Sequence, residues 1–199
     1  MHPFFQELRA KLEQSPGKPF HLPGVTLRES AVLVPLFLRE GAPYALFTKR
    51  PTTLRQHAGQ ISFPGGSRDP EDASPLHTAL RETREELGLP ETHVEVLGML
   101  DEIPTLTGFR IVPFVGAIPP DFAYVPSEAE VSEVIEVPLS HLMNPGFRRK
   151  ERRKWNDREY DLYFYDYGEH IIWGATAHIL TDLLQLAAEL PALKRLITP

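Results

Sequence analysis

Hydrophobic and polar positions change their period several times along the chain, and each change marks an element. Apolar residues at helical spacing predict a helix over Pro3 to Gln14, and the Ser-Pro-Gly-Lys-Pro segment 15–19 ends it as a linker. Apolar, β-rich runs predict strands over Ala31 to Leu38 and Tyr44 to Thr48, with a turn at 40–43 between them. The chain therefore starts with a helix and then turns to strands.

The later elements mix strands and helices. The same patterns predict strands near Val94 to Leu100, Arg110 to Ala117 and Val131 to Val137, helices over Ser74 to Leu87 and about Thr176 to Glu189, and a hairpin in Phe147 to Tyr165 that turns near Asn156-Asp157. Helices and strands interleave without strict alternation. This order predicts an α/β fold in which a mixed sheet lies between helices.

Three glutamates cluster on the helix that follows the Phe-Pro-Gly-Gly turn 63–66. Glu82, Glu85 and Glu86 stand at i, i+3 and i+4, so we expect one helical face to carry all three carboxylates. Like charges so placed repel each other, and clustered oxygen ligands suit a hard cation such as Mg²⁺. The opposite face is predicted to pack on the core through Leu76, Ala79, Leu80, Thr83 and Leu87.

Adjacent glutamates on a helix are most often a solvated surface, and this alternative stays open for the pair alone. The glycine turn, the Arg-Glu pair, the Glu-Glu pair and the terminating Gly88 occur together in one short segment, which favours a metal site. Asp72 or Ser74 is expected to cap the helix, with Ser74 favoured because Pro75 follows it. Gly88 and Pro90 are expected to end the helix.

This segment resembles the signature of the Nudix hydrolases, which runs Gly, five residues, Glu, seven residues and then Arg-Glu-apolar-any-Glu-Glu-any-Gly-apolar. The positions that fit are Gly66, Arg81, Glu82, Glu85, Glu86, Gly88 and Leu89. Asp72 stands where the loop glutamate belongs, eight residues then precede Arg81, and Thr83 replaces an apolar residue. Asp69, Glu71 and Asp72 are the alternatives for the loop acid. The resemblance implies an α/β/α sandwich with a mixed sheet and a metal site at Glu82, Glu85, Glu86 and the Gly66 carbonyl.

A second motif resembles the coenzyme A pyrophosphatase branch of that family. It comprises the Leu-Phe-Thr-Lys-Arg strand end at 46–50 and the Leu-x-x-His-x-Gly-Gln-x-x-Phe-Pro-Gly-Gly string 54–66, and the likeness extends over about 31–187. It implies a substrate site at Arg50, Arg55, His57, Gly59 and Gly65. Arg50 and Arg55 are the expected readers of the ribose 3′-phosphate, whereas His57 is as well explained by a structural hydrogen bond. The basic run 148–154 is either a solvated face or a further phosphate contact.

Composition limits the remaining possibilities. A chain of 199 residues fits a single domain over 1–199, with 1–20 as its N-terminal helix and linker. Cysteine is absent, which excludes disulfides and thiolate chemistry, and a cytoplasmic location is expected. We expect neither a secretory signal nor a membrane span. The formal charge of −6 argues against nucleic-acid binding, and the apolar C-terminal helix together with the resemblance suggests a homodimer.

The resemblance implies hydrolysis of the diphosphate bond of coenzyme A or its derivatives to 4′-phosphopantetheine and adenosine 3′,5′-bisphosphate, with Mg²⁺ or Mn²⁺ as cofactor. Glu82 or Glu86 would take the proton from water, or an acid from the set Glu128, Glu130 and Glu133 would do so. One alternative is a Nudix enzyme for another nucleoside diphosphate derivative, such as ADP-ribose or a dinucleotide. A more distant alternative is a Nudix-like module that binds a nucleotide without hydrolysing it.

Overall fold

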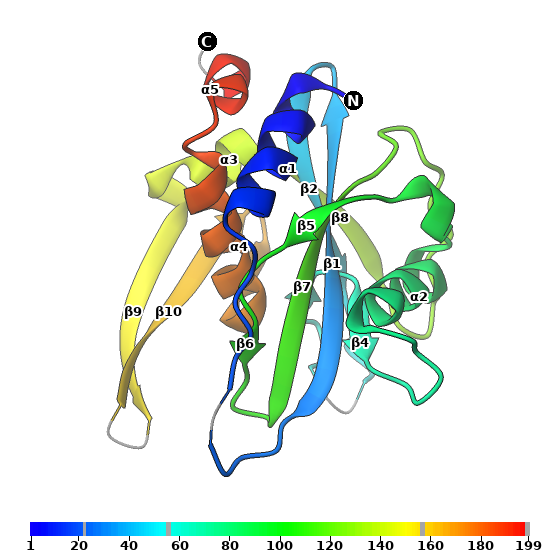
Figure 1. The fold of residues 1–199 in the computed structure, drawn as a ribbon, viewed down its shortest axis with the longest axis vertical. Helices are drawn as coiled ribbons and strands as arrows, with labels where there is room; N and C mark the ends of the chain where they lie inside the picture. The colour runs from blue at the N-terminus through cyan, green and yellow to red at the C-terminus, as the bar shows by residue number, and fades with distance from the viewer. Residues whose placement is uncertain (22, 55–56, 156–157, 198–199) are drawn as a thin grey trace.

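The computed structural model describes residues 1–21, 23–54, 57–155 and 158–197 (Figure 1). Arg55 and the predicted hairpin turn at Asn156-Asp157 lie outside these residues. The helices and short 3₁₀ turns are α1 (Pro3–Gln14), α2 (Pro75–Leu87), η1 (Glu91–His93), α3 (Leu139–Met143), η2 (Pro145–Phe147), α4 (Gly174–Ala187) and α5 (Pro191–Ile197).

The main sheet is mixed. Its strands are β1 (Arg28–Arg39), β2 (Ala42–Lys49), β3 (Ile61–Ser62), β4 (Gly65–Ser67), β5 (Glu95–Met99), β6 (Ile103–Pro104), β7 (Phe109–Ala117) and β8 (Glu133–Pro138). The central path is β3-β2-β1-β7-β5, while β4 pairs with β1, β6 with β7, and β8 with β2. β1 and β7 run parallel and the other pairs are antiparallel, so the predicted mixed sheet is confirmed.

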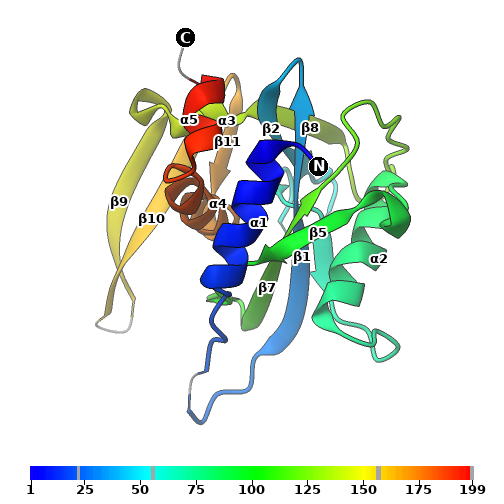
Figure 2. The same ribbon diagram turned by 45° about the horizontal axis from the view of Figure 1, so that its top comes forward.

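Helices cover both faces of the main sheet, which gives the predicted α/β/α sandwich. α2 lies on one face, and α1 and α4 lie on the other (Figures 1 and 2). Alternate residues of β1 divide between these layers, because Val34 and Leu36 join the core under α1 and α4 whereas Ala31 packs with Ala79 of α2. The strand pattern thereby fixes which helix lies on which face.

The long helix α4, which the sequence predicted as the final helix, is part of this core. Six of its apolar residues are buried within the chain: Ala177, Ile179, Leu180, Leu183, Leu184 and Ala187. The apolar face that suggested a homodimer is therefore already covered and offers no surface to a partner. In the described part of the chain, no helix combines the length and the apolar character that crossing a bilayer requires.

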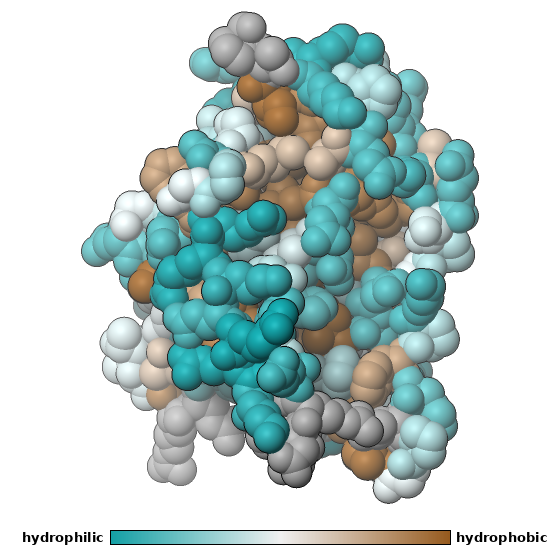
Figure 3. Space-filling view, turned by 90° about the vertical axis from the view of Figure 1, so that its left-hand side faces the viewer, coloured by the Kyte–Doolittle hydropathy of each residue, from teal (hydrophilic) through white to brown (hydrophobic). Residues whose placement is uncertain are grey.

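A second sheet of three strands flanks α4. It consists of β9 (Arg148–Trp155), β10 (Arg158–Tyr167) and β11 (His170–Trp173) in the order β11-β10-β9, and the Tyr165 hydroxyl lies 2.8 Å from Thr181 Oγ1 of α4. The basic run forms most of β9, where Lys150 pairs with Asp161 at 3.1 Å. Figure 3 views this side of the molecule, where hydrophilic residues gather in the lower left of the view and a hydrophobic area lies above them. The contacts support a solvated, ion-paired face for the basic run.

The caps of α2 agree with the sequence. Ser74 is the N-cap, and its hydroxyl accepts a hydrogen bond from the His77 N–H at 3.2 Å, with Pro75 in the first turn. Gly88 ends the helix in the left-handed conformation at φ 69°. Both boundaries of α2 are thus fixed by local side-chain and backbone chemistry.

Candidate metal centre

Three carboxylates meet at one end of α2. Glu82 and Glu86 come from the helix, and Glu130 comes from the loop between β7 and β8. One oxygen of each lies within 4.8 Å of the others. Such a group of hard oxygen ligands is what a divalent cation of the Mg²⁺ type requires.

Glu86 is the buried member of this group, at 3% exposure. Its Oε2 atom has no hydrogen-bond partner among the described residues. Burial raises the pKa of Glu86 to about 8, and the charges of Glu82 and Glu130 act in the same direction, while Arg50 and the Gly65 N–H oppose them. A bound cation would stabilise the charged form of this buried carboxylate.

The glycine turn lets β4 approach these carboxylates. A Cβ atom at Gly66 would lie 2.5 Å from the Glu82 carboxyl carbon, so any side chain here would displace the Glu82 carboxylate. Gly65 has φ 151°, and a Cβ atom there would lie 2.3 Å from the Ala31 carbonyl oxygen. The two glycines therefore place backbone, rather than side chains, over the acidic group.

Backbone hydrogen bonds hold the loop that carries Glu130 against α2. The Val125 N–H donates to the Leu87 carbonyl and the Ser127 N–H to the Glu86 carbonyl, both at 2.9 Å. The Glu130 N–H then donates to the Ser127 carbonyl at 2.9 Å. These bonds also satisfy carbonyls at the C-terminus of the helix. Glu130 is thus already placed beside Glu86.

Glu85 lies apart from this group. Its side chain is 48% exposed and pairs with Arg81 at 3.0 Å. The expectation of one acidic face opposite one packing face needs correction, because Glu86 is buried on the same side as Thr83 and Leu87. Glu86 has neighbours on this side of the helix, because the Gly65 N–H of β4 acts on its carboxylate and the Ser127 N–H of the later loop donates to its carbonyl.

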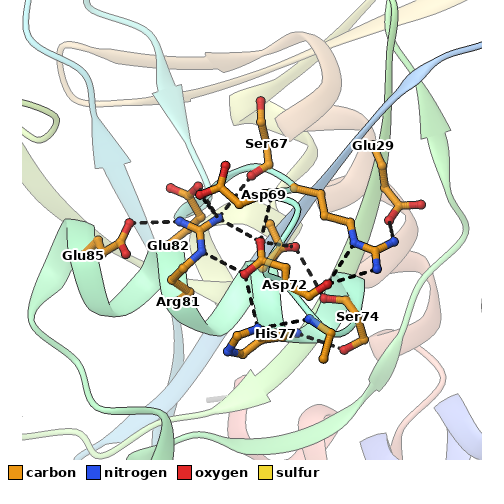
Figure 4. Close-up of polar contacts among 12 residues, drawn as sticks. Glu29, Ser67, Asp69, Asp72, Ser74, His77, Arg81, Glu82 and Glu85 are labelled. Carbon is orange, nitrogen blue, oxygen red and sulfur yellow. Dashed lines mark hydrogen bonds and ion pairs between the residues drawn. The ribbon is translucent and has the colours of Figure 1, made fainter.

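Arg81 of α2 forms a buried ion pair with Asp72, which lies in the loop before the helix (Figure 4). The Arg81 Nε and Nη2 atoms donate to Asp72 at 3.0 and 2.9 Å, and the Thr78 hydroxyl donates to Asp72 at 2.9 Å. The hydrogen bond from Arg81 holds the pKa of Asp72 well below its usual range. Among the three alternatives for the loop acid, Asp72 is the one that Arg81 engages most closely.

Arg81 also extends toward the metal centre. Its Nη2 atom lies 3.0 Å from Glu82 and donates to the Ser67 carbonyl at 3.2 Å. Burial raises the pKa of Glu82, and Arg81 opposes that rise. The guanidinium therefore links the loop, β4 and the first glutamate of the site, and it holds that glutamate in position.

Of the expected substrate residues that the structure describes, Arg50, His57 and Gly59 lie on the segment before β4, and Gly65 is the first residue of that strand. The Arg50 N–H donates to the Gln60 carbonyl at 2.9 Å, and the Arg50 Nε is buried without a partner in the described ranges. His57 has φ 56°, and its Nδ1 lies 2.6 Å from Gln60 Oε1, which supports the structural interpretation of this histidine. Gly59 has φ 68° in the same turn.

The donor set fits Mg²⁺ or Mn²⁺. It offers three carboxylates, a buried oxygen without a partner and a backbone cradle that a side chain would block. Glu130 is the member that sequence reasoning did not single out. It appeared only among three candidate bases, because its place depends on a loop that returns to the helix from 44 residues downstream of Glu86.

Comparison with known proteins identifies several similar chains. The NUDIX domain model matches residues 27–160. A protein of Cronobacter sakazakii, described as "Uncharacterized Nudix hydrolase NudL", is 38% identical over 187 residues, which cover 94% of this chain and 93% of the relative. A relative of the same description in Escherichia coli is 41% identical over 163 residues, covering 78% and 81% of the two chains.

A solved structure agrees with the architecture. The MutT/nudix family protein from Enterococcus faecalis has a TM-score of 0.59 and 16% sequence identity, covering 89% of this chain and 70% of that one. At this identity the likeness concerns the fold alone. It places the sandwich and its mixed sheet among known architectures.

Proposed function

Because this chain belongs to the Nudix hydrolase family, we propose that it hydrolyses the diphosphate bond of coenzyme A or its derivatives to 4′-phosphopantetheine and adenosine 3′,5′-bisphosphate. The observation that carries the hydrolase chemistry is the group of three carboxylates around the unpartnered oxygen of Glu86. The coenzyme A branch motif at 46–66 supports the choice of substrate.

Glu82, Glu86 and Glu130 would hold the Mg²⁺ or Mn²⁺ ion, with the Gly66 carbonyl as a further oxygen beside Glu82. When bound, the ion supplies charge neutralisation for the diphosphate and lowers the pKa of a coordinated water. Glu85 stays in the proposed ligand set as a peripheral member, because its carboxylate is exposed and pairs with Arg81.

The chain's own residues supply orientation and proton transfer. Arg81 holds Glu82 from one side, and Gly66 leaves room for it on the other. We assign the proton of the attacking water to the Glu130 carboxylate, which is exposed and lies within the acidic group. Glu133 is a weaker choice, because Lys49 and His170 each lie 3.2 Å from its carboxylate.

Arg50 is proposed to contact the diphosphate. Its charge acts on Glu86, so its guanidinium belongs beside the reacting group. The buried Nε atom of Arg50 has no hydrogen-bond partner among the described residues, so it is a donor available to an anion that is not part of the chain. His57 and Gly59 shape the neighbouring turn, and the Gly65 N–H acts on Glu86. Arg55 keeps its proposed substrate role from the sequence.

The test is hydrolysis of coenzyme A, 3′-dephospho-coenzyme A and ADP-ribose with Mg²⁺, Mn²⁺ or a chelator, with products identified by chromatography and mass. Metal-dependent preference for coenzyme A supports the proposal. Preference for ADP-ribose or a dinucleotide would keep the metal centre and replace the substrate. Absence of turnover with all of them would favour a nucleotide-binding module.

We also keep two further predictions of the sequence, a cytoplasmic location and a homodimer, and the homodimer now rests on the family resemblance alone. Light scattering of the purified chain measures its mass in solution. A monomer at all concentrations would contradict the second prediction.

A further inference from the structure

An open cavity of about 450 Å³ lies beside the metal centre, at the far end of β4. Six residues line it: Arg28, Glu29, Ser67, Arg68, Asp69 and Pro70. Its volume falls in the range of small-molecule sites. None of its lining residues belongs to the acidic group at Glu82, Glu86 and Glu130.

The cavity and the metal centre share one short strand. Gly66 abuts Glu82, Ser67 follows in the cavity wall, and Arg68 comes next. Two residues of extended strand span roughly 7 Å. One ligand can therefore reach both places if its two anionic groups are separated by about the width of a sugar ring.

The acidic residues of the cavity already have cationic partners. Glu29 accepts from Arg68 at 2.6 Å and also pairs with Arg110, while Asp69 lies 3.7 Å from Arg81. Neither carboxylate is therefore left to repel an anion in full. Without Arg28, the positive and negative charges at the cavity wall nearly cancel.

Arg28 is the cation that has no such partner. No carboxylate of the described ranges lies within ion-pair distance of its guanidinium, which sits 4.0 Å over the Phe109 ring and reaches the Thr107 carbonyl at 3.5 Å. The aromatic ring positions the guanidinium without using its hydrogen-bond donors. Most of the Arg28 donors consequently face solvent at the cavity.

Ser67 adds a hydroxyl group to this wall. Its carbonyl accepts from Arg81, and Figure 4 shows its side chain directed away from that guanidinium. An arginine fork together with a hydroxyl is a donor set that suits a phosphate monoester. The metal centre would take the diphosphate, so the cavity suits the phosphate that is not cleaved.

We propose that this cavity binds the phosphate monoester of the substrate, the ribose 3′-phosphate in coenzyme A, and that Arg28 distinguishes substrates with this group from those without it. The inference rests on the proposed function, because it assumes that the diphosphate occupies the adjacent metal centre. It moves recognition of the 3′-phosphate from the motif at Arg50 and Arg55 to the other end of β4.

The test compares kcat/KM for coenzyme A and 3′-dephospho-coenzyme A in the wild type, Arg28→Ala and Arg28→Lys. Loss of charge-assisted hydrogen bonds predicts a fall of roughly 10- to 100-fold for coenzyme A in Arg28→Ala, with little change for the dephosphorylated substrate. Arg28→Lys should recover part of the preference. Arg9→Ala is the matched control, because Arg9 lies on helix α1, away from the cavity, and pairs with Glu95 of β5.

An equal loss on both substrates, or an unchanged preference in Arg28→Ala, would overturn the inference while leaving the proposed function intact. If the wild type hydrolyses no coenzyme A, the proposed function itself fails. Calorimetric titration of the metal-free protein with adenosine 3′,5′-bisphosphate and with AMP then decides the cavity separately. Tighter binding of the bisphosphate that Arg28→Ala abolishes would support the site, and equal affinity for the two ligands would refute it.

Discussion

Two buried carboxylates, Asp72 and Glu86, lie at opposite ends of the segment formed by α2 and the loop before it. The charge that surrounds Asp72 is mainly positive, and the charge that surrounds Glu86 is mainly negative. Asp72 accepts two hydrogen bonds from Arg81 and one from Thr78, and its pKa is depressed. Glu86 has neighbours of its own charge, an oxygen without a partner and a raised pKa. The chain gives Asp72 a hydrogen-bonded cation, whereas Glu86 has only the nearby charge of Arg50 to oppose its acidic neighbours.

The difference separates a structural acid from a functional one. A buried charge with a complete set of partners contributes to holding the fold, since removing either partner leaves the other uncompensated. A buried acidic group without a counter-charge costs stability and persists where an external cation completes it. Sequence alone shows both residues as acids in one motif, and only their partners assign them to different roles.

Glu86→Gln should have the largest effect on activity. We expect kcat to fall about a thousandfold, because an amide cannot supply the charge that holds the cation. The unfolding midpoint of the metal-free protein should stay the same or rise, since a neutral group suits the buried position. Steady-state kinetics and thermal unfolding measure the two quantities. Glu95→Gln, in the surface pair with Arg9, is the control and should leave both unchanged.

Asp72→Asn should mainly affect stability. Arg81 would lose its buried counter-charge, which predicts a loss of about 3 kcal/mol in the free energy of unfolding, or a fall of roughly 8 °C in Tm. Because the folded pKa of Asp72 lies below its ordinary value of 3.8, the wild-type advantage is complete above that value and shrinks as pH falls further. Denaturant titrations at pH 7 and pH 3 check this. A difference that grows on acidification would contradict the assigned role.

Mg²⁺ should stabilise the wild type but not Glu86→Gln. Binding to the folded state at a hundred times the Kd predicts a gain of about 2.7 kcal/mol. The measurement is the unfolding midpoint with Mg²⁺ and with chelator. Equal shifts in the two proteins would place the cation elsewhere.

Glu85→Gln should give the smallest loss. Glu85 is exposed and pairs with Arg81, so we expect kcat to fall by about tenfold or less. This is the low end of the effects seen for residues that contact metal ligands rather than the metal. A loss as large as that of Glu86→Gln would make Glu85 a principal ligand and would remove the distinction drawn from burial.

The sequence predicted much of this architecture for identifiable reasons. Strong periodicity marked the long strands, and Ser74, Pro75 and Gly88 fixed α2 because caps are local chemistry. The three-residue strand β4 and the helix α5 were not predicted. Short elements carry too few residues to show a period, and their positions depend on tertiary contacts.

The site was predicted only in part for a similar reason. Helical spacing grouped Glu82, Glu85 and Glu86, yet spacing cannot show that Glu86 is buried while Glu85 is exposed to solvent. Nor does it show that Glu130 returns to the helix, because that contact depends on hydrogen bonds to the backbone of Glu86 and Leu87. Burial and long-range contact decide which acids act together.

Because Glu130 reaches the site on a later loop, the complete set of carboxylates forms only late in folding. During synthesis, a chain that has emerged only through α2 contains Glu82 and Glu86 but lacks both Glu130 and the backbone bonds from Val125 and Ser127 that seat its loop. The full ligand set forms only after β7 and the following loop have docked. We therefore expect the proposed cation to bind tightly only to chains that have completed this docking.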